Sequence, residues 1–229
     1  KLSSFDVFSG SGIVSRFLKQ YSSEIYTNDL EEYARIISSC YLSNKSEINF
    51  DELTQLRTQL INSVKEKIPL YLSKDKNYFL DPNNMPGFIS DMYAPKNLND
   101  IKKEERCFYT PYNACFLDLM RQEIDAVVPD NLKKFFIAPL LSEASIHANT
   151  GGVFKGFYKN TNTGIGRFGG TAENALFRIK GDITLELPVL SNYECPSHIF
   201  SSDANILAQS SDWPFIITAN TMVEYAHKR

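Results

Sequence analysis

A short glycine turn near the start of the chain carries the residues best suited to hold a ligand. The stretch FSGSG consists of Phe8, Ser9, Gly10, Ser11 and Gly12. Glycines between a strand and a helix let the backbone approach a ligand closely, and they leave the first N–H groups of the helix facing it. A tight turn that binds nothing uses the same glycines, so this motif alone leaves both interpretations open.

An acid placed after the turn favours the binding interpretation. Asp29 ends the stretch EIYTND, seventeen residues after Gly12. A carboxylate in this position accepts hydrogen bonds from the hydroxyl groups of a nucleotide ribose. Val14 and Ser15 stand where a dinucleotide-binding turn has its third glycine, which disfavours a pyrophosphate cofactor. The pattern therefore predicts an adenosine-bearing cofactor without a pyrophosphate.

The elements that must position this turn alternate between strands and helices. Residues 3–10 (SSFDVFSG) and 24–30 (EIYTNDL) are typical of short strands, and apolar residues at helical spacing follow each of them. Helical periodicity returns at residues 47–72, 109–128 and 129–148. Near the end, residues 182–190 (DITLELPVL) alternate as in a strand, and residues 198–207 (HIFSSDANIL) read as a strand followed by a helix start.

Composition narrows the class of protein. The net charge of −3 argues mildly against a nucleic-acid partner, yet residues 131–180 hold seven Lys and Arg against two Glu. Such a basic segment between acidic flanks is compatible with a phosphate-facing lobe. The longest apolar runs are far shorter than the roughly 20 residues of a membrane span, and no signal peptide is visible. We therefore expect a cytoplasmic protein with no membrane partner.

The cysteines and histidines predict no metal site. The four cysteines are widely spaced and form no C-x-x-C pair, and the three histidines form no ligand pattern with them. This spacing is typical of reduced thiols in a cytoplasmic protein.

Several stretches together carry a family resemblance. The segment DVFSGSGIVSRFLKQYSSEIYTNDLEEYA resembles the S-adenosylmethionine motif of D12-class (alpha-group) DNA adenine-N6 methyltransferases of restriction-modification type. FYTPYNACFLDLMRQEID, PLLSEASIHANTGGVFKGFYKN, GIGRFGG and SSDANIL are similar to further stretches of these enzymes, and the resemblance extends over about residues 5–207. It implies a site-specific enzyme that transfers a methyl group from S-adenosylmethionine to N6 of adenine in double-stranded DNA.

The resemblance also implies a fold and a division into domains. The expected fold is α/β: a Rossmann-like S-adenosylmethionine-dependent methyltransferase sheet, incomplete, with a mainly helical target-recognition insert. Residues 1–47 and 183–229 would form the cofactor-binding domain, and residues 48–182 the DNA-binding insert. Because part of the sheet is expected to be missing, its exposed edge predicts self-association.

Roles in cofactor binding follow from the resemblance at matching positions. Residues 8–12 would line the site for the methionine and adenosine parts of the cofactor. Asp29 would accept hydrogen bonds from the ribose hydroxyls. Asp203 in SSDA would accept a hydrogen bond from the exocyclic amine of the cofactor adenine. The alternative for Asp203 is a helix N-cap before ANIL, and the two roles are compatible.

The glycine-rich segment 144–180 is implied to face DNA. It contains candidates for phosphate contacts, namely Lys155, Lys159, Arg167, Arg178 and Lys180. It also contains candidates for base-edge contacts, namely Asn149, Thr150 and Asn160. Aromatic residues in the segment would stack on bases or pack in the core. The alternative for the whole segment is a solvated loop with ordinary surface charges, and His147 is expected to be structural.

The catalytic turn of the family, D/N/S-P-P-Y/F/W, is not found. TPYN at residues 110–113 precedes the recognition insert and begins a helix. The nearest candidates are Asp212, Pro214 and Phe215 of DWPF, but Trp213 replaces the first proline and the spacing from Asp203 is short. The match ends after Leu207, and both ends of the chain look cut. The alternative function is therefore a catalytically inactive remnant that folds and binds DNA or cofactor. A small-molecule methyltransferase is disfavoured because it has no use for the long insert.

Overall fold

The computed structural model describes residues 2–151, 156–170, 175–209 and 216–218 and divides the chain into two compact units. The first unit consists of Lys1–Asp51 and Leu187–Arg229, and the second of Glu52–Glu186. These boundaries lie a few residues from the expected ones, while the roles of the two units stay a prediction. No helix in the described ranges is long and apolar enough to cross a membrane.

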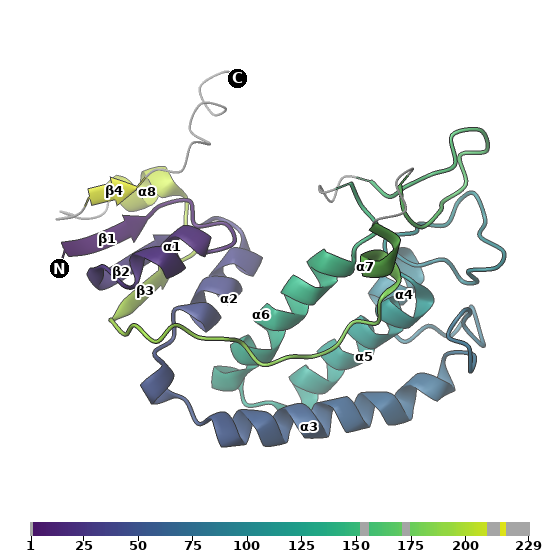
Figure 1. The fold of residues 1–229 in the computed structure, drawn as a ribbon, viewed down its shortest axis with the longest axis horizontal. Coiled ribbons are helices and arrows are strands. Elements are labelled where there is room, and N and C mark those ends of the chain that lie inside the picture. The colour runs from purple at the N-terminus through teal and green to yellow at the C-terminus, as the bar shows by residue number, and fades with distance from the viewer. Residues whose placement is uncertain (1, 152–155, 171–174, 210–215, 219–229) are drawn as a thin grey trace. The chain divides into compact units, whose positions relative to one another are not determined.

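The first unit is built around a small sheet (Figure 1). Its elements, in chain order, are β1 (Leu2–Asp6), α1 (Ile13–Leu18), β2 (Ser22–Asn28), α2 (Glu32–Tyr41), the 3₁₀ turn η1 (Lys45–Glu47), β3 (Ser197–Phe200), α8 (Ala204–Gln209) and β4 (Ile216–Thr218). The strands and helices expected at residues 3–10, 24–30 and 198–207 are thus present. The described strands and helices of both units together make the chain a mixed α/β protein.

All described strands of this sheet are parallel, in the order β3-β2-β1-β4. Phe5 of β1 pairs with Tyr26 of β2 on one side and with Ile217 of β4 on the other. Ile25 of β2 pairs with Ser197 of β3. Because parallel strands end at the same edge, the residues that follow β1, β2 and β3 are brought together there.

The core of the first unit contains Ile25, Leu42 and Cys195, and Leu18 and Ile199 pack against it. The apolar residues at helical spacing along α1 do not belong to this core, since Ile13 is 64% exposed and Phe17 is 59% exposed. Ser15 is the buried residue of α1. The inward face of this helix is therefore formed by Ser15 and Leu18, while Ile13 and Phe17 face outward.

The second unit is helical. It contains α3 (Phe50–Lys67, whose first residues precede the unit boundary), the 3₁₀ turn η2 (Ile68–Leu70), α4 (Phe88–Met92), α5 (Pro111–Val127), α6 (Asp130–His147) and α7 (Leu176–Lys180). Buried side chains of α5, such as Met120 and Ile124, and of α6, such as Phe136, form its centre. The three helical segments predicted from the apolar periodicity correspond to α3, α5 and α6.

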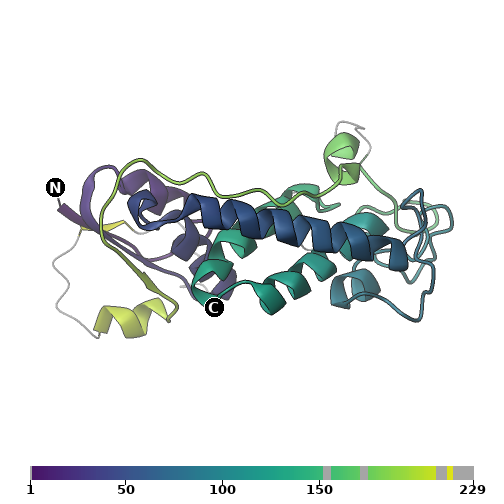
Figure 2. The ribbon, with the colours of Figure 1, turned by 90° about the horizontal axis from the view of Figure 1, so that it is seen from below.

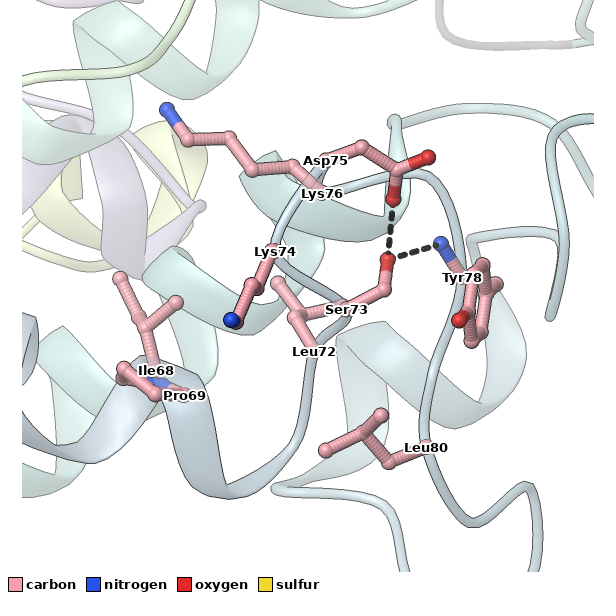
Figure 3. A pocket seen from close by; sticks show the side chains of 9 residues that line it. All are labelled: Ile68, Pro69, Leu72, Ser73, Lys74, Asp75, Lys76, Tyr78 and Leu80. Carbon is pink, nitrogen blue, oxygen red and sulfur yellow. Dashed lines mark hydrogen bonds between the residues drawn. The ribbon is translucent and has the colours of Figure 1, made fainter.

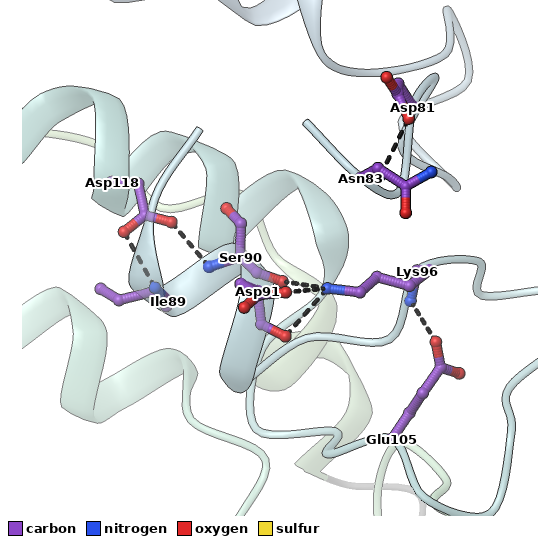
Figure 4. Close-up of polar contacts among 8 residues, drawn as sticks. All are labelled: Asp81, Asn83, Ile89, Ser90, Asp91, Lys96, Glu105 and Asp118. Atoms are coloured by element: carbon purple, nitrogen blue, oxygen red, sulfur yellow. Dashed lines mark hydrogen bonds and ion pairs between the residues drawn. The ribbon is translucent and has the colours of Figure 1, made fainter. Parts of the chain in front are cut away.

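Polar contacts fix the short helix α4 (Figure 4). Asp118 of α5 accepts the N–H groups of Ile89 and Ser90 at 3.0 and 2.7 Å. Lys96 donates to the carbonyl and the carboxylate of Asp91, each at 2.9 Å. A Cβ at Gly87 would lie 2.7 Å from the Asp118 carboxylate, so only glycine allows this close approach.

The expected strand at residues 182–190 is not formed. Ile183 and Leu185 are buried and alternate with exposed neighbours, but the backbone pairs with helix side chains instead of another strand. Ile183 N–H donates to the side chain of Asn113 at 2.9 Å, and Arg57 of α3 donates to the Leu185 carbonyl at 2.6 Å. Figure 2 shows this extended stretch beside α3. The alternation reflects an extended chain packed on helices.

The four cysteines, Cys40, Cys107, Cys115 and Cys195, are free and buried. Burial raises the pKa of Cys107 and of Cys115 to about 12. No group of three or more His, Cys, Asp or Glu within the described ranges is placed to hold a metal ion.

Candidate functional site

The glycine turn connects β1 to α1 with two residues in the left-handed region. Gly10 has φ +50° and Gly12 has φ +70°, where a side chain is strained. Gly12 N–H donates to the Ser9 carbonyl at 2.7 Å, which closes the turn. A Cβ at Gly10 would have no atom within 4 Å, so the turn is open to solvent at this residue.

Asp29, which follows β2, reaches this turn. Its Oδ2 accepts the N–H of Gly10 at 2.8 Å, and its Oδ1 accepts the N–H of Glu31 at 3.0 Å. Ser9 N–H also donates to the Asn28 carbonyl at 2.9 Å. Each carboxylate oxygen has a second lone pair, so Asp29 keeps acceptor capacity for a ligand hydroxyl. The structure thus brings together the glycine turn and the acid, while the ribose contact itself stays a prediction.

Asn28 joins three segments at this edge of the sheet, a role that sequence reasoning missed. Its side-chain amide donates to the carbonyls of Val7 and Ser202 at 3.2 and 3.0 Å, and its Oδ1 accepts the Ser202 N–H at 3.1 Å. The side chain is buried. An amide at a strand end, directly before the acid, is the sequence signal that was available.

Asp203 lies one residue after this junction and caps α8. Its Oδ1 accepts the N–H groups of Asn205 and Ile206 at 2.8 and 3.3 Å. The N-cap alternative is therefore what the structure shows. Asp203 is exposed, and its contact with a cofactor adenine stays a prediction.

Asp6, the last residue of β1, is a buried acid that sequence reasoning also missed. Only 1% of its surface is exposed, and its Oδ2 accepts the Ser15 hydroxyl at 2.6 Å. Its Oδ1 is buried and has no hydrogen-bond partner among the described residues. Burial raises the pKa of Asp6, which the Ser15 hydrogen bond offsets in part. An unpaired buried acceptor next to a glycine turn fits a site for a ligand donor.

Lys19 is fully buried in the same unit and has a structural role. Its ammonium group donates to the carbonyls of Leu42 and Ser43 at 2.8 and 2.9 Å, at the C-terminal end of α2. Burial lowers the pKa of Lys19, and the charges of Cys195, Glu194 and Glu47 offset this only in part. The cation satisfies helix carbonyls that have no intrahelical donor.

Asn149 differs most from its expected role at a base edge. Its side chain is buried, and its amide donates to the carbonyls of Cys107 and Arg167 at 2.6 and 2.8 Å. Its Oδ1 accepts the Gly169 N–H at 2.9 Å. These bonds occupy the amide within the protein, so Asn149 organises the glycine-rich segment. Thr150 beside it is buried as well.

The candidate phosphate contacts have different environments. Lys159 and Lys180 are exposed, whereas Arg167 is half-buried and its Nε has no partner among the described residues. Arg178 donates to the carbonyls of Ile146 and Ala148, the latter at 3.4 Å, and so covers the end of α6. Lys155 lies outside the described residues.

The candidates for a catalytic turn gain no support. Asp212, Pro214 and Phe215 lie outside the described residues. In TPYN, Thr110 caps α5 by accepting the Asn113 N–H at 3.2 Å. The Asn113 side chain is buried and donates to the Gly181 carbonyl at 2.9 Å. TPYN is therefore a helix start, as expected from the sequence.

A hollow of about 710 Å³ lies in the second unit, after η2 (Figure 3). Ile68, Leu72 and Leu80 form apolar parts of its wall. Ser73 shapes the turn, because its hydroxyl donates to Asp75 at 2.6 Å and accepts the Tyr78 N–H at 3.3 Å. Among the described residues, none of the predicted site residues lines this hollow.

Comparisons with known proteins give matches to parts of the chain. Over 160 residues, which are 67% of the chain, the sequence is 26% identical to the type II methyltransferase M.CviAII of Paramecium bursaria Chlorella virus 1. The matched region spans 40% of that relative's length. Residues 204–229, most of them outside the described ranges, match the family described as 1,4-alpha-glucan branching enzyme, C-terminal. No solved structure matches the chain. The longer match supports a relationship to type II methyltransferases.

Proposed function

We propose that this chain belongs to a site-specific DNA methyltransferase that transfers a methyl group from S-adenosylmethionine to N6 of adenine in double-stranded DNA. The observation that carries the proposal is the contact between the Asp29 carboxylate and the Gly10 N–H, at the edge where parallel strands end. The similarity to a type II methyltransferase supports the enzyme class. The D12 class and the N6 position rest on the resemblance of the quoted motifs.

The sheet supports a Rossmann-like fold for the first unit. The parallel order β3-β2-β1-β4 is the order 3-2-1-4 found in doubly wound nucleotide-binding sheets. In such sheets, ligands bind outside the carboxyl ends of the strands, where the glycine turn and Asp29 lie. Self-association of this unit stays a prediction.

The residues present fit the proposed cofactor. Asp29 has lone pairs left for ribose hydroxyls, and the open turn at Gly10 admits a ligand close to the backbone. Asp6 holds a buried carboxyl group with an unpaired oxygen near the same turn. S-adenosylmethionine supplies an electrophilic methyl group on a sulfonium cation, which suits an acidic surrounding.

The second unit supplies the proposed DNA contacts. Lys159, between α6 and α7, and Lys180, at the end of α7, are exposed there and would meet phosphates.

The first experiment is a calorimetric titration of the purified chain with S-adenosylmethionine. Saturable binding that Asp29→Ala weakens at least about 10-fold is expected, because the variant loses a charged acceptor. Asp51→Ala removes an exposed acid from α3 and serves as the control. Unchanged binding by a folded Asp29→Ala variant would contradict the proposed site.

The second experiment is transfer of a labelled methyl group to adenine-containing duplexes. Label in N6-methyladenine is the expected product. Cofactor and DNA binding without transfer would instead favour a chain that binds but does not catalyse.

A further inference from the structure

The glycine-rich segment contains a hairpin whose tip is polar and exposed. Arg167 N–H donates to the Tyr158 carbonyl at 2.9 Å, and Asn160 N–H donates to the Ile165 carbonyl at 2.8 Å. Lys159 pairs with Gly166 as an antiparallel bridge between these two bonds. The hairpin is the green loop that projects from the helices of its unit in Figure 1.

The tip of this hairpin is held in one shape by its own side chains. Asn160 Oδ1 accepts the N–H groups of Asn162 and Thr163 at 2.9 and 3.2 Å. Gly164, with φ +70°, returns its N–H to the Asn160 carbonyl at 2.8 Å. The Asn160 side chain is thus used in the turn. Thr161 and Asn162 are exposed, and their side chains make no hydrogen bond to other described residues.

The root of the hairpin is fixed to the helical unit. Asn149 binds the carbonyls of Cys107 and Arg167, and the ring of Phe157 meets that of Phe108 edge-on at 5.2 Å. A Cβ at Gly166 would lie 2.3 Å from the Cys107 sulfur, so the hairpin packs tightly there. A polar tip on a rigid root suits recognition, because little order has to be gained on binding.

Cations stand beside the tip. The Lys103 side chain, from a distant part of the sequence, has its Cε 3.8 Å from the position of a Cβ at Gly164. Lys159 is exposed on the hairpin itself, with its ammonium 4.9 Å from the centre of the Phe157 ring. Neither lysine forms an ion pair with described residues. The neighbouring Glu105 is engaged by the N–H groups of Lys96 and Lys102.

We propose that this hairpin tip enters a groove of duplex DNA and that Thr161 and Asn162 read base edges while Lys103 and Lys159 contact phosphates. The major groove admits a two-stranded β-ribbon, asparagine pairs with adenine there, and threonine offers a hydroxyl and a methyl group. The two lysines hold the tip in register. This inference rests on the proposed function and assigns its sequence-reading residues.

The test is selection from a pool of randomised duplexes, followed by sequencing and by binding titrations at several salt concentrations. The full chain should enrich a short sequence. Asn162→Ala and Thr161→Ala should each relax the preference at one or two base pairs by roughly 10-fold. Lys103→Gln should weaken binding to all sequences and lower the salt slope by about 1.

Matched controls separate these effects from misfolding. Asn205→Ala changes an exposed asparagine of the first unit, and Lys65→Gln removes an exposed lysine of α3; neither should alter selection. Each tip variant should keep the S-adenosylmethionine affinity of the parent.

Two results overturn the inference, and they are distinguishable. A parent chain that selects a sequence, with Asn162→Ala and Thr161→Ala variants that select it equally well, leaves the proposed function standing and removes the role of the tip. A folded parent that retains no duplex, or prefers single-stranded RNA, contradicts both proposals.

Discussion

Two buried asparagines organise the irregular parts of the two units, and they do so in different surroundings. Asn28 joins the glycine turn to the turn after β3 at the edge of a sheet. Asn149 joins loop carbonyls that have no sheet to support them. In the first unit the residue next to the asparagine, Asp29, is the ligand candidate. In the second, the candidates lie on a hairpin that starts several residues away.

This difference shows how far a candidate ligand-binding residue lies from the buried asparagine that fixes its surroundings. Strands already fix the sheet edge, so Asn28 only has to align turns whose side chains stay accessible. The glycine-rich segment has few ladder bonds of its own, and Asn149 takes the place of a strand partner. The hydrogen-bonding groups of Asn149 are all used within the protein, so its side chain is not left to bind a ligand.

Loss of the second anchor should have the largest effect. Asn149→Ala leaves two carbonyls and one N–H group without partners, and we expect it to lower the free energy of unfolding by about 3 kcal/mol or more. Urea unfolding followed by circular dichroism measures this. Asn162→Ala, at the exposed tip, should change stability by less than about 0.5 kcal/mol. Equal effects of the two substitutions would contradict the assigned roles.

Loss of the first anchor should cost less. Asn28→Ala frees groups of Val7 and Ser202 that are only partly buried and reached by water more easily, so a loss of about 2 kcal/mol is expected. The same unfolding experiment gives the comparison. Affinity for S-adenosylmethionine should fall as well, because the turns lose their alignment. If Asn28→Ala lowers the free energy of unfolding as much as Asn149→Ala does, the two asparagines do not differ in the way proposed.

Substitutions of one left-handed glycine in each unit should lower stability by similar amounts but affect different ligands. Gly12→Ala and Gly164→Ala each place a side chain at φ +70°, which costs about 1–2 kcal/mol. We expect the first to weaken cofactor binding and the second to weaken duplex binding. Gly156→Ala, where a Cβ meets nothing within 4 Å, is the control. Weaker duplex binding by Gly12→Ala, or weaker cofactor binding by Gly164→Ala, would show that the two turns do not act separately.

The smallest expected effect concerns the pH dependence of stability. Burial raises the pKa of Asp6, so its protonated form favours the folded state. Its contribution is fully present below the unfolded pKa of about 3.9 and is lost as pH rises through the folded pKa. Asp6→Asn should therefore gain stability relative to the parent between acidic and neutral pH, as thermal unfolding at several pH values would show. Asp203→Asn is the exposed control, and parallel curves for parent and Asp6→Asn would refute the assignment.

Local patterns in the sequence predicted the elements well where periodicity was sustained. Apolar spacing located α3, α5 and α6, and the order strand, turn, helix located the start of the sheet. The alternation at residues 182–190 predicted a strand wrongly, because Asn113 and Arg57 supply bonds that only the tertiary structure brings there. Alternation reports burial on one side and does not identify the hydrogen-bond partner.

The candidate site was predictable where its residues are near in sequence. The turn and Asp29 follow a recognised spacing, so their meeting was expected. Lys103 could not be placed beside Gly164 from the sequence, since a helix pair separates them along the chain. The burial of Asn149 was equally hidden, because the type of residue suits a buried anchor and a base contact alike.

Because each unit contains two buried cysteines, thiol labelling can detect the opening of either unit. Cys40 and Cys195 belong to the first unit, and Cys107 and Cys115 to the second. A thiol reagent at neutral pH should react with each pair only when its unit opens, because all four side chains are buried in the folded protein. The rate of labelling at each cysteine, measured by mass spectrometry, then gives the opening frequency of each unit without any engineered cysteine.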